Sequence, residues 1–371
     1  MLQPRVAIVG AGPAGYALAA DLHAHHNSVL IYSHPSHTSH TDAVIRKGVL
    51  RSNGLIVSAI TPRTTTDMAD VVAFAKTVVI TVPSTGQETV WEELRRFDLS
   101  AHTIVAVPGN LFGLVVQREL RDVKVRAILE TNLSPYSCRM SEGALVVLGK
   151  KSSFHIARLD DPPSLTNPIH HPPDDDADVR LRLTALFPLH LHWCANIVEV
   201  CLSNINGVFH PLMVLLNAGR IESTSGAFFF YRDGLTRSVA NALVAVDTCR
   251  IAVGAALGMS LPSVIQVSNE CYGHTFTDLV QLARESEPHR DLRAPQGVES
   301  RNIAEDVGDL LVAWYALARV LGVECAPLYA VIVMAGMCTG VDYLVEGRGL
   351  ARLGLEGVGR EELIARFGVR R

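Results

Sequence analysis

The sequence predicts an α/β domain built on a parallel sheet, followed by an all-helical domain. Three observations lead to this fold class. Short β-branched runs alternate with helical segments up to about residue 158, as crossover connections in a parallel sheet require. A proline-rich stretch then interrupts the pattern at residues 160–178. From residue 196 onward the apolar residues recur at helical spacing. We therefore expect one domain over residues 1–195 and a second over residues 196–371.

The individual elements follow from these runs in chain order. The expected strands of the first domain are the apolar runs at 6–9, 28–32, 54–59, 77–82, 103–107 and 124–128. The expected helices between them span 14–25, 67–75 and 112–120. Five prolines and an acidic run predict an exposed loop over 160–178, followed by a strand pair over 181–193. In the second domain we expect helices at 196–218, 235–257, 302–322 and 326–344.

Composition and charge narrow the functional class. With 371 residues, 48% of them hydrophobic, the chain has enough apolar material for two buried cores. Its net charge of -4 and lack of a basic cluster argue against a nucleic-acid partner. Seven cysteines without a CxxC pair indicate a reducing compartment, so we expect a cytoplasmic protein. The late apolar stretch 328–344 contains Asp342 and is shorter than the ~20 residues of a membrane span, so no membrane association is expected.

The clearest motif is VAIVGAGPAG near the N-terminus, where a strand leads into a helix. Gly10, Gly12 and Gly15 have GxGxxG spacing. The first glycine permits a tight turn, the second lets the backbone approach a pyrophosphate, and the third allows close helix–strand packing. Pro13 and Ala14 complete the loop at the helix N-terminus, where unpaired N–H groups favour anions. The motif therefore predicts a Rossmann-like dinucleotide-binding domain.

The end of the second strand bears on which dinucleotide binds. An NAD site usually has an acidic residue there for the ribose 2′-OH, but this chain has Ser33 and His34. These side chains, with Arg46 or Lys47, are suited to a 2′-phosphate. The alternative is that Asp42 contacts the ribose. The sequence favours NADP as cofactor, with NAD possible.

Two later strands end in loops that face the same edge of the predicted sheet. Val82 and Pro83 end the run ITVPST, and Pro108 and Gly109 follow the run VAVPGN. Loops at the carboxyl ends of such strands contact the nicotinamide in a Rossmann domain. The alternative is that these residues only terminate their strands.

In the helical half, three polar residues lie in apolar surroundings. His210 lies in an apolar run with Phe209 and Leu212, and Arg301 precedes Asp306 by five positions at the start of a long helix. A core histidine, a helix-terminal aspartate and a surface ion pair are the structural alternatives. We expect ligands to bind in a cleft between the two domains.

These motifs together resemble the octopine/nopaline (opine) dehydrogenase family, and the resemblance covers nearly the whole chain. Besides VAIVGAGPAG and the Pro108–Gly109 turn, the shared pieces are ETNLSPYSCR at 130–139, NxxxHPxxxLLNAG at 206–219, FYRDGLT at 230–236 and RNIAEDV at 301–307. Each piece is loose, but their order and spacing together are fairly specific.

The resemblance implies a reaction and an active site. Enzymes of this family condense an amino acid with a 2-oxo acid and reduce the imine with NAD(P)H, using a His, an Arg and an Asp. His210, Arg301 and Asp306 match those positions. The chemistry suits them: a histidine moves protons near neutral pH, an aspartate orients it, and an arginine binds a carboxylate. The partners so implied are small molecules, an amino acid or related amine and a 2-oxo acid.

Other residues are weaker candidates. Asn217, two helical turns after His210, and Tyr136 are expected to contact substrate, although both are equally suited to packing. Glu130 at a strand end is similarly ambiguous. The run HAHH at 23–26 ends an exposed helix without a carboxylate or cysteine nearby, so no metal is expected.

The chain also departs from the family pattern. The loop VPSTGQET lacks the histidine-like ending common there, and Cys249 stands where the family tends to have an acidic residue. The second change puts an internal ion pair in doubt. Two other functions fit the same scaffold: a reductase of a single 2-oxo acid or cyclic imine, and a dinucleotide-binding protein without turnover. The apolar helices after residue 326 could form a homodimer face, but an internal core explains them as well.

Overall fold

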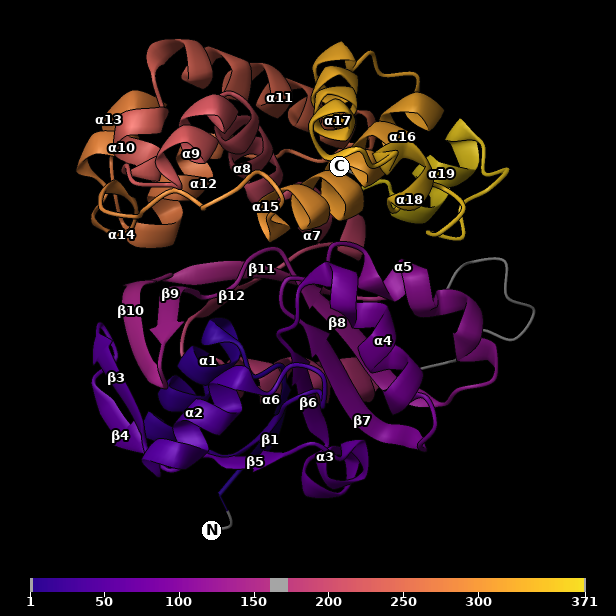
Figure 1. The fold of residues 1–371 in the computed structure, drawn as a ribbon. Helices are drawn as coiled ribbons and strands as arrows, with labels where there is room; N and C mark the ends of the chain where they lie inside the picture. The colour runs from indigo at the N-terminus through magenta and orange to yellow at the C-terminus, as the bar shows by residue number, and fades with distance from the viewer. Residues whose placement is uncertain (1–2, 161–172, 370–371) are drawn as a thin grey trace. The chain divides into compact units, whose positions relative to one another are not determined.

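The computed structural model describes residues 3–160 and 173–369, so residues 161–172 of the loop expected over 160–178 lie outside the described residues. The chain divides into two compact units, Met1–Ile197 and Val198–Arg371, against an expected boundary after residue 195. Figure 1 shows the strands, in indigo to magenta, in the first unit and the later helices, in red to yellow, in the second.

The first unit is built on an eight-stranded sheet with the order β12-β11-β8-β7-β6-β1-β2-β5. Every neighbouring pair is parallel except β8 and β11. The six strands from β5 to β8 have the 3-2-1-4-5-6 order of dinucleotide-binding sheets, with the reversal between β1 and β6. The predicted Rossmann-like sheet is confirmed. Its strands are β1 (Arg5–Val9), β2 (Ser28–Tyr32), β5 (Arg63–Thr65), β6 (Thr77–Ile80), β7 (Leu99–Ala106), β8 (Val125–Thr131), β11 (Ser153–Arg158) and β12 (His190–Trp193).

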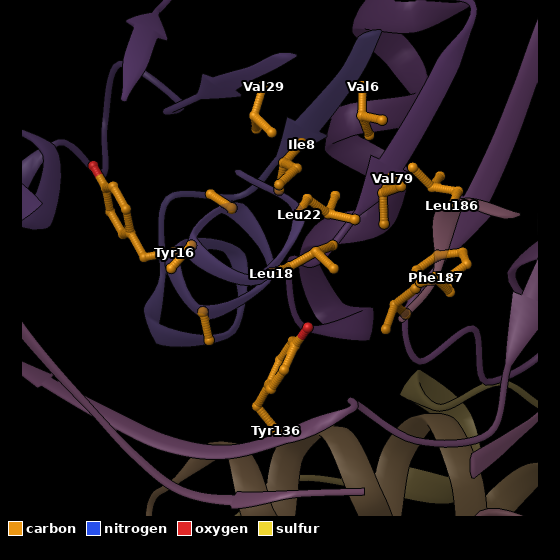
Figure 2. Close-up of a cluster of buried hydrophobic side chains, with 14 of the residues drawn as sticks. Val6, Ile8, Tyr16, Leu18, Leu22, Val29, Val79, Tyr136, Leu186 and Phe187 are labelled. Carbon is orange, nitrogen blue, oxygen red and sulfur yellow. The ribbon is translucent and has the colours of Figure 1, made fainter. Parts of the chain in front are cut away.

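Helices cover both faces of this sheet. They are α1 (Pro13–Ala24), α2 (Ser39–Lys47), α3 (Met68–Phe74), α4 (Ser84–Leu94), α5 (Phe112–Val116), a 3-10 turn (Gln117–Arg121) and α6 (Pro173–Leu186). Alternate residues of β1 point to opposite faces. Val6 and Ile8 pack with Leu18 of α1 and Leu186 of α6, as Figure 2 shows. On the other face, Ala7 and Val9 pack with side chains of α3, α4 and α5.

The strand expected over 54–59 is wrong. The chain forms a hairpin there, β3 (Leu50–Gly54) and β4 (Ser58–Ile60), within a separate four-stranded sheet. The other strands of that sheet, β9 (Tyr136–Ser141) and β10 (Ala144–Lys150), were not expected. Gly54 has a φ of 86°, and a side chain there would lie 2.2 Å from the Val147 carbonyl of β10. The glycine therefore ends β3. The place of the third strand in the main sheet is taken instead by the short β5.

The loop and strand pair expected over 173–193 are also wrong, because the chain forms α6 and the single strand β12. Proline and acidic residues at the start of a segment are signals of a helix N-terminus. The Arg126 guanidinium contacts Asp175 at 2.8 Å and Asp178 at 2.5 Å, which ties α6 to β8. Arg158 adds a contact of 3.3 Å to Asp175.

We expect Arg126→Met to destabilise the protein in a pH-dependent way. Burial acts to raise the pKa of Asp175, but the hydrogen bonds and charges of Arg126 and Arg158 outweigh it and hold that pKa below its ordinary range. A lowered folded-state pKa contributes stability that is present at neutral pH and lost as the pH falls through it. Calorimetry should show a Tm lower by about 2–4 °C at pH 7, corresponding to one kcal/mol or less, and a smaller difference near pH 3.

The matched control is Arg182→Met. Arg182 contacts Asp178 at 2.8 Å, but the Arg182 side chain is largely exposed. The Tm of the Arg182→Met variant should therefore differ little from that of the wild type. If Arg126→Met lowered Tm by the same amount at pH 7 and near pH 3, this account would be contradicted.

The second unit is helical, and the predicted helical domain is confirmed. The helices are α7 (Ile197–Leu202), α8 (Asn206–Leu215), α9 (Ala218–Thr224), α10 (Phe230–Gly234), α11 (Arg237–Ala256), α12 (Val264–Tyr272), α13 (Leu279–Glu285), α14 (Glu287–Arg290), α15 (Arg301–Ile303), the π-helix η2 (Ala304–Leu311), α16 (Val312–Leu321), α17 (Ala326–Thr339), α18 (Tyr343–Glu346) and α19 (Arg360–Phe367). The single helices expected at 196–218, 302–322 and 326–344 are each divided.

A buried ion pair joins the helices of this unit, which corrects the doubt raised by Cys249. Arg250 Nη2 lies 2.6 Å from Asp247 Oδ1, one turn earlier on α11. The remaining donors of Arg250 reach the carbonyls of Leu202 and Pro262. Asp247 in turn accepts from the Val264 N–H at 2.8 Å. The internal pair is therefore present, with Asp247 as its acid.

Two described stretches, Ile197–Leu215 and Arg237–Ala256, are long and apolar enough by length and composition to cross a membrane. Of their apolar windows, 83% and 50% are buried inside the fold, and core helices meet the same criterion.

Candidate active site

The loop between β1 and α1 has the geometry of a dinucleotide site. Gly10 has a φ of 129°, and a side chain there would lie 2.6 Å from Thr81 Oγ1. At Gly15 a side chain would lie 1.9 Å from the Gly10 carbonyl oxygen. Only glycine fits at these two positions, so the chain can turn sharply and α1 can approach the sheet.

The start of α1 is suited to bind an anion. Gly12 is its N-cap, has no side-chain cap, and has no described atom within 4 Å of the position that a Cβ would occupy. Pro13 fixes the first helical residue, and both Pro13 and Ala14 are partly exposed. The first backbone N–H groups and the helix dipole therefore present a positive end to solvent. These residues fit the pyrophosphate of NAD or NADP.

The loop after β6 adjoins this turn. The Thr81 hydroxyl donates to the Gly10 carbonyl at 3.1 Å and so links the two loops. Val82 is partly buried and Pro83 is exposed, directly before α4. Both residues therefore lie at the edge of the sheet where the dinucleotide loop turns.

The loop after β7 is shaped by a buried carboxylate. Glu130 of β8 is fully buried and accepts the N–H of Leu111 at 2.8 Å and that of Gly113 at 2.6 Å. A side chain at Gly109 would lie 2.1 Å from Glu130 Oε2, so glycine is required there. Gln87 of α4 donates to the Pro108 carbonyl at 2.8 Å. Glu130, ambiguous in the sequence, thus fixes the backbone of the Pro108–Gly109 loop.

At the end of β2 the structure separates the two expected residues. The Ser33 hydroxyl is buried and donates to the His37 carbonyl at 3.2 Å, so it is engaged within its own loop. His34 is partly exposed, with Nε2 3.5 Å from Glu93 Oε1 of α4. Tyr32 donates to the other Glu93 oxygen at 2.5 Å. Burial, and then Glu93, raises the pKa of Tyr32, which keeps it a donor. Glu93 could not be predicted from the sequence, because it lies on α4 and no local pattern relates it to His34.

In the second unit, His210 and Asp306 form a hydrogen-bonded pair. His210 Nδ1 of α8 lies 2.7 Å from Asp306 Oδ2 of η2. The imidazole side chain is 20% exposed and the carboxylate 5%. Because a carboxylate only accepts, the proton lies on Nδ1 and Nε2 remains to exchange protons with a substrate. This arrangement is suited to a proton-transfer base held by an orienting acid.

A glycine explains why α8 and η2 come so close. A side chain at Gly207, one turn before His210, would lie 2.8 Å from Leu310 Cδ2 and 3.0 Å from Trp314 Cη2. The absence of a side chain lets the two helices pack closely at this level. His210 can therefore reach Asp306 directly.

The π-helical geometry of η2 bears on Arg301. In a regular α-helix, residues five apart lie about 140° apart around the axis. Hydrogen bonding from residue i to i+5 winds the chain more slowly and reduces that angle, so we expect the winding from Ala304 onward to bring Arg301 and Asp306 nearer to one side of the helix. Arg301 is exposed, and its side chain forms no hydrogen bond or ion pair with the described residues. Its guanidinium is thus suited to bind a carboxylate of a ligand.

Tyr136 does not take the expected place. It lies in the core of the first unit, with its hydroxyl donating to Asp21 Oδ2 at 2.6 Å (Figure 2). Lys150 also contacts that aspartate at 2.8 Å. Burial and Asp21 raise the pKa of Tyr136. The expectation that Tyr136 contacts substrate is therefore replaced by a packing role.

Asn217 also has a structural role. Helix α8 ends at Leu215, so Asn217 does not continue the face that carries His210. Its amide donates to the carbonyls of Met213 at 2.9 Å and Gly234 at 3.3 Å. These bonds join the end of α8 to α10, and the amide nitrogen is used by the protein itself.

Known proteins are similar to this chain in both of its units. Residues 193–339 match the family model described as the α-helical domain of NAD/NADP octopine/nopaline dehydrogenase. Protein ocs of Agrobacterium tumefaciens (strain Ach5) is 29% identical over 95% of this chain and 96% of its own length. The opine dehydrogenase of Arthrobacter sp. (strain 1C) is 27% identical, with 95% of each chain covered.

Solved structures agree at the level of the fold. An octopine dehydrogenase in complex with NADH and agmatine has a TM-score of 0.72 at 19% identity, covering 100% of this chain and 99% of the other. Family model, curated relatives and fold lead to one conclusion. Residues 193–339 match the helical domain of octopine/nopaline dehydrogenases, and the whole chain is similar to opine dehydrogenases in sequence and fold, which supports an NAD(P)-dependent oxidoreductase acting on CH–NH bonds.

Proposed function

We propose that the protein condenses an amino acid, or a related amine, with a 2-oxo acid and reduces the resulting imine to a secondary amine. The observation that carries this proposal is the 2.7 Å contact between His210 and the buried Asp306, five residues after the exposed Arg301. A proton-transfer group, its orienting acid and a carboxylate-binding cation are what this reaction needs. Relatives named opine dehydrogenase and D-nopaline dehydrogenase support the same reaction.

Each of the three residues then has a distinct role. Arg301 binds the carboxylate of the oxo acid through its guanidinium fork and so fixes the carbonyl carbon. The amine attacks that carbon and gives up a proton to His210 Nε2, which returns it to the carbinolamine hydroxyl as that group leaves as water. Asp306 keeps the imidazole in one orientation and stabilises its cationic form. When bound, NAD(P)H supplies the hydride that reduces the imine carbon.

We propose NADP as the preferred cofactor, with NAD as the alternative. His34, partly exposed at the end of β2, is the candidate contact for a 2′-phosphate, and Arg46 and Lys47 of α2 are exposed cations of the same unit. Ser33 is no longer part of this argument because its hydroxyl is engaged. Asp42, the candidate contact for an NAD ribose, accepts from Thr38 at 2.8 Å.

We place the protein in the cytoplasm. All seven cysteines are free, which is typical of a reducing compartment. A nicotinamide cofactor and small organic acids as substrates support the same location.

Product analysis tests the reaction. Purified protein, NADPH deuterated at C4 of the nicotinamide, pooled amino acids and pooled 2-oxo acids should give products detectable by mass spectrometry. Each product should weigh the sum of one amino acid and one oxo acid less one oxygen atom, with deuterium at the former carbonyl carbon. Deuterated 2-hydroxy acids in place of such products would contradict the proposal and favour a single-substrate reductase.

A further inference from the structure

We propose that Arg348 is a positioning residue that holds the π-helix η2 in register, and so keeps the Asp306 carboxylate against His210. The inference rests on the proposed function, in which these two residues form the proton-transfer pair. It concerns a residue 42 positions beyond Asp306 that has no role in the mechanism above.

The first observation is a backbone contact between η2 and the segment that follows α18. The Arg348 N–H donates to the Gly308 carbonyl at 2.8 Å. The approach is very close, because a side chain at Gly347 would lie 2.4 Å from that same carbonyl oxygen. Gly347 has an ordinary φ of -75°, so the glycine is required by this close approach rather than by its backbone conformation.

The second observation is a buried ion pair at the next residue of η2. Arg348 Nε lies 3.6 Å from Asp309 Oδ1, and the two side chains are 0% and 4% exposed. Asp309 is one of three buried carboxylates in η2, together with Glu305 and Asp306. Burying several like charges in one helical turn is costly unless a cation compensates them. Arg348 supplies that charge next to Asp309.

The two contacts act on the same short stretch of helix. A carbonyl inside an α-helix normally accepts only the N–H four residues later, whereas the Gly308 carbonyl has a donor from outside the helix. Together with the Asp309 ion pair, this donor holds the chain in the wider π conformation, which elsewhere occurs as short segments at functional sites. Asp306 lies two residues before Gly308. If η2 reverted to α-helical winding, its carboxylate would rotate away from His210.

The test is a double-mutant cycle between Arg348 and Asp306. Turnover of NADPH is measured with pooled amino acids and pooled 2-oxo acids. In the wild-type background, Arg348→Gln should lower kcat by about 10- to 100-fold, since an error of ~1 Å in a catalytic group costs that much. In an Asp306→Asn background, the same change should lower kcat less than about threefold, because the contact it protects is already lost. The KM for NADPH should not change.

Arg348→Lys should recover part of kcat relative to Arg348→Gln, because lysine keeps the positive charge next to Asp309 whereas glutamine does not. The matched control is Arg352→Gln. Arg352 lies 3.5 Å from the same Asp309 oxygen, but its side chain is 34% exposed and solvent compensates its loss. We expect the control to retain at least a third of wild-type kcat.

If Arg348→Gln lowered kcat by the same factor in the wild-type and Asp306→Asn backgrounds, Arg348 would act only on stability, and the proposal would be overturned. If Arg348→Gln does not fold, Gly347→Ala tests the same docking contact in the same cycle. The His210→Ala variant separates this inference from the proposed function. Wild-type turnover by His210→Ala would overturn both, whereas an inactive His210→Ala beside a fully active Arg348→Gln would overturn the positioning role alone.

Discussion

Replacing His210 by alanine is expected to lower kcat by about 10²- to 10⁴-fold, the usual contribution of a general acid–base group. The imidazole that is removed is held by a 2.7 Å bond to a carboxylate that is 5% exposed, and alanine has no group that can transfer a proton in its place. The dissociation constant of NADPH, measured by fluorescence quenching, should stay within about twofold, because the dinucleotide loop lies in the first unit.

Two further variants make the result specific. Asp306→Asn should lower kcat less than His210→Ala, because the imidazole remains but loses its orienting charge. His274→Ala removes another partly buried histidine of the same unit, which packs on Tyr272 and Phe276, and should leave kcat within about threefold. If His210→Ala kept more than a tenth of wild-type kcat, the assignment of His210 would fail. Lost turnover with unchanged NADPH binding would exclude a protein that only senses the dinucleotide.

The second large effect is expected at the phosphate-binding loop, where Gly12→Ala should weaken NADPH binding by about 10- to 100-fold, as loss of a hydrogen bond to a charged group does. No described atom lies within 4 Å of the added methyl group, and Gly12 has an ordinary φ of -86°. The fold should therefore accept the change, with Tm in the absence of cofactor lowered by less than about 2 °C. The methyl group would instead occupy the space through which a pyrophosphate approaches the N–H groups of α1.

Gly15→Ala serves as the contrasting variant. Its methyl group would lie 1.9 Å from the Gly10 carbonyl oxygen, so both Tm and NADPH affinity should fall. We expect a Tm lower by about 5–10 °C, as an overpacked site would give. Unchanged NADPH affinity in Gly12→Ala would show that the dinucleotide does not bind at this loop.

Features that depend on residues close together in the sequence could be predicted from the sequence. Gly10, Gly12 and Gly15 specify a turn through their own spacing, and alternating strands and helices specify a parallel sheet. The pairing of His210 with Asp306 is different, because the residues are 96 positions apart and only the family resemblance related them. Nothing in the composition of either segment indicates that α8 and η2 pack together.

The errors have physical causes as well. The segment starting at Pro173 was assigned to a loop because proline and aspartate occur in both loops and helix starts, and its partner Arg126 is distant in sequence. Cys249 puts the internal ion pair in doubt at the level of the sequence because the acid stands instead at Asp247, one helical turn from Arg250. Tyr136 was assigned to a ligand site because the sequence does not show that Asp21 of α1 lies opposite its hydroxyl. The π-helical winding of η2 depends on tertiary contacts such as those of Arg348, which no local pattern encodes.

The most direct test of the central claim is cofactor oxidation with each substrate pool omitted in turn. Purified protein is given NADPH, or NADH in a parallel series, with pooled amino acids and pooled 2-oxo acids, and the loss of absorbance is followed. We predict turnover that requires both pools, with a higher kcat/KM for NADPH than for NADH. Turnover with the 2-oxo acids alone, unchanged when the amino acids are added, would contradict a reductive condensation.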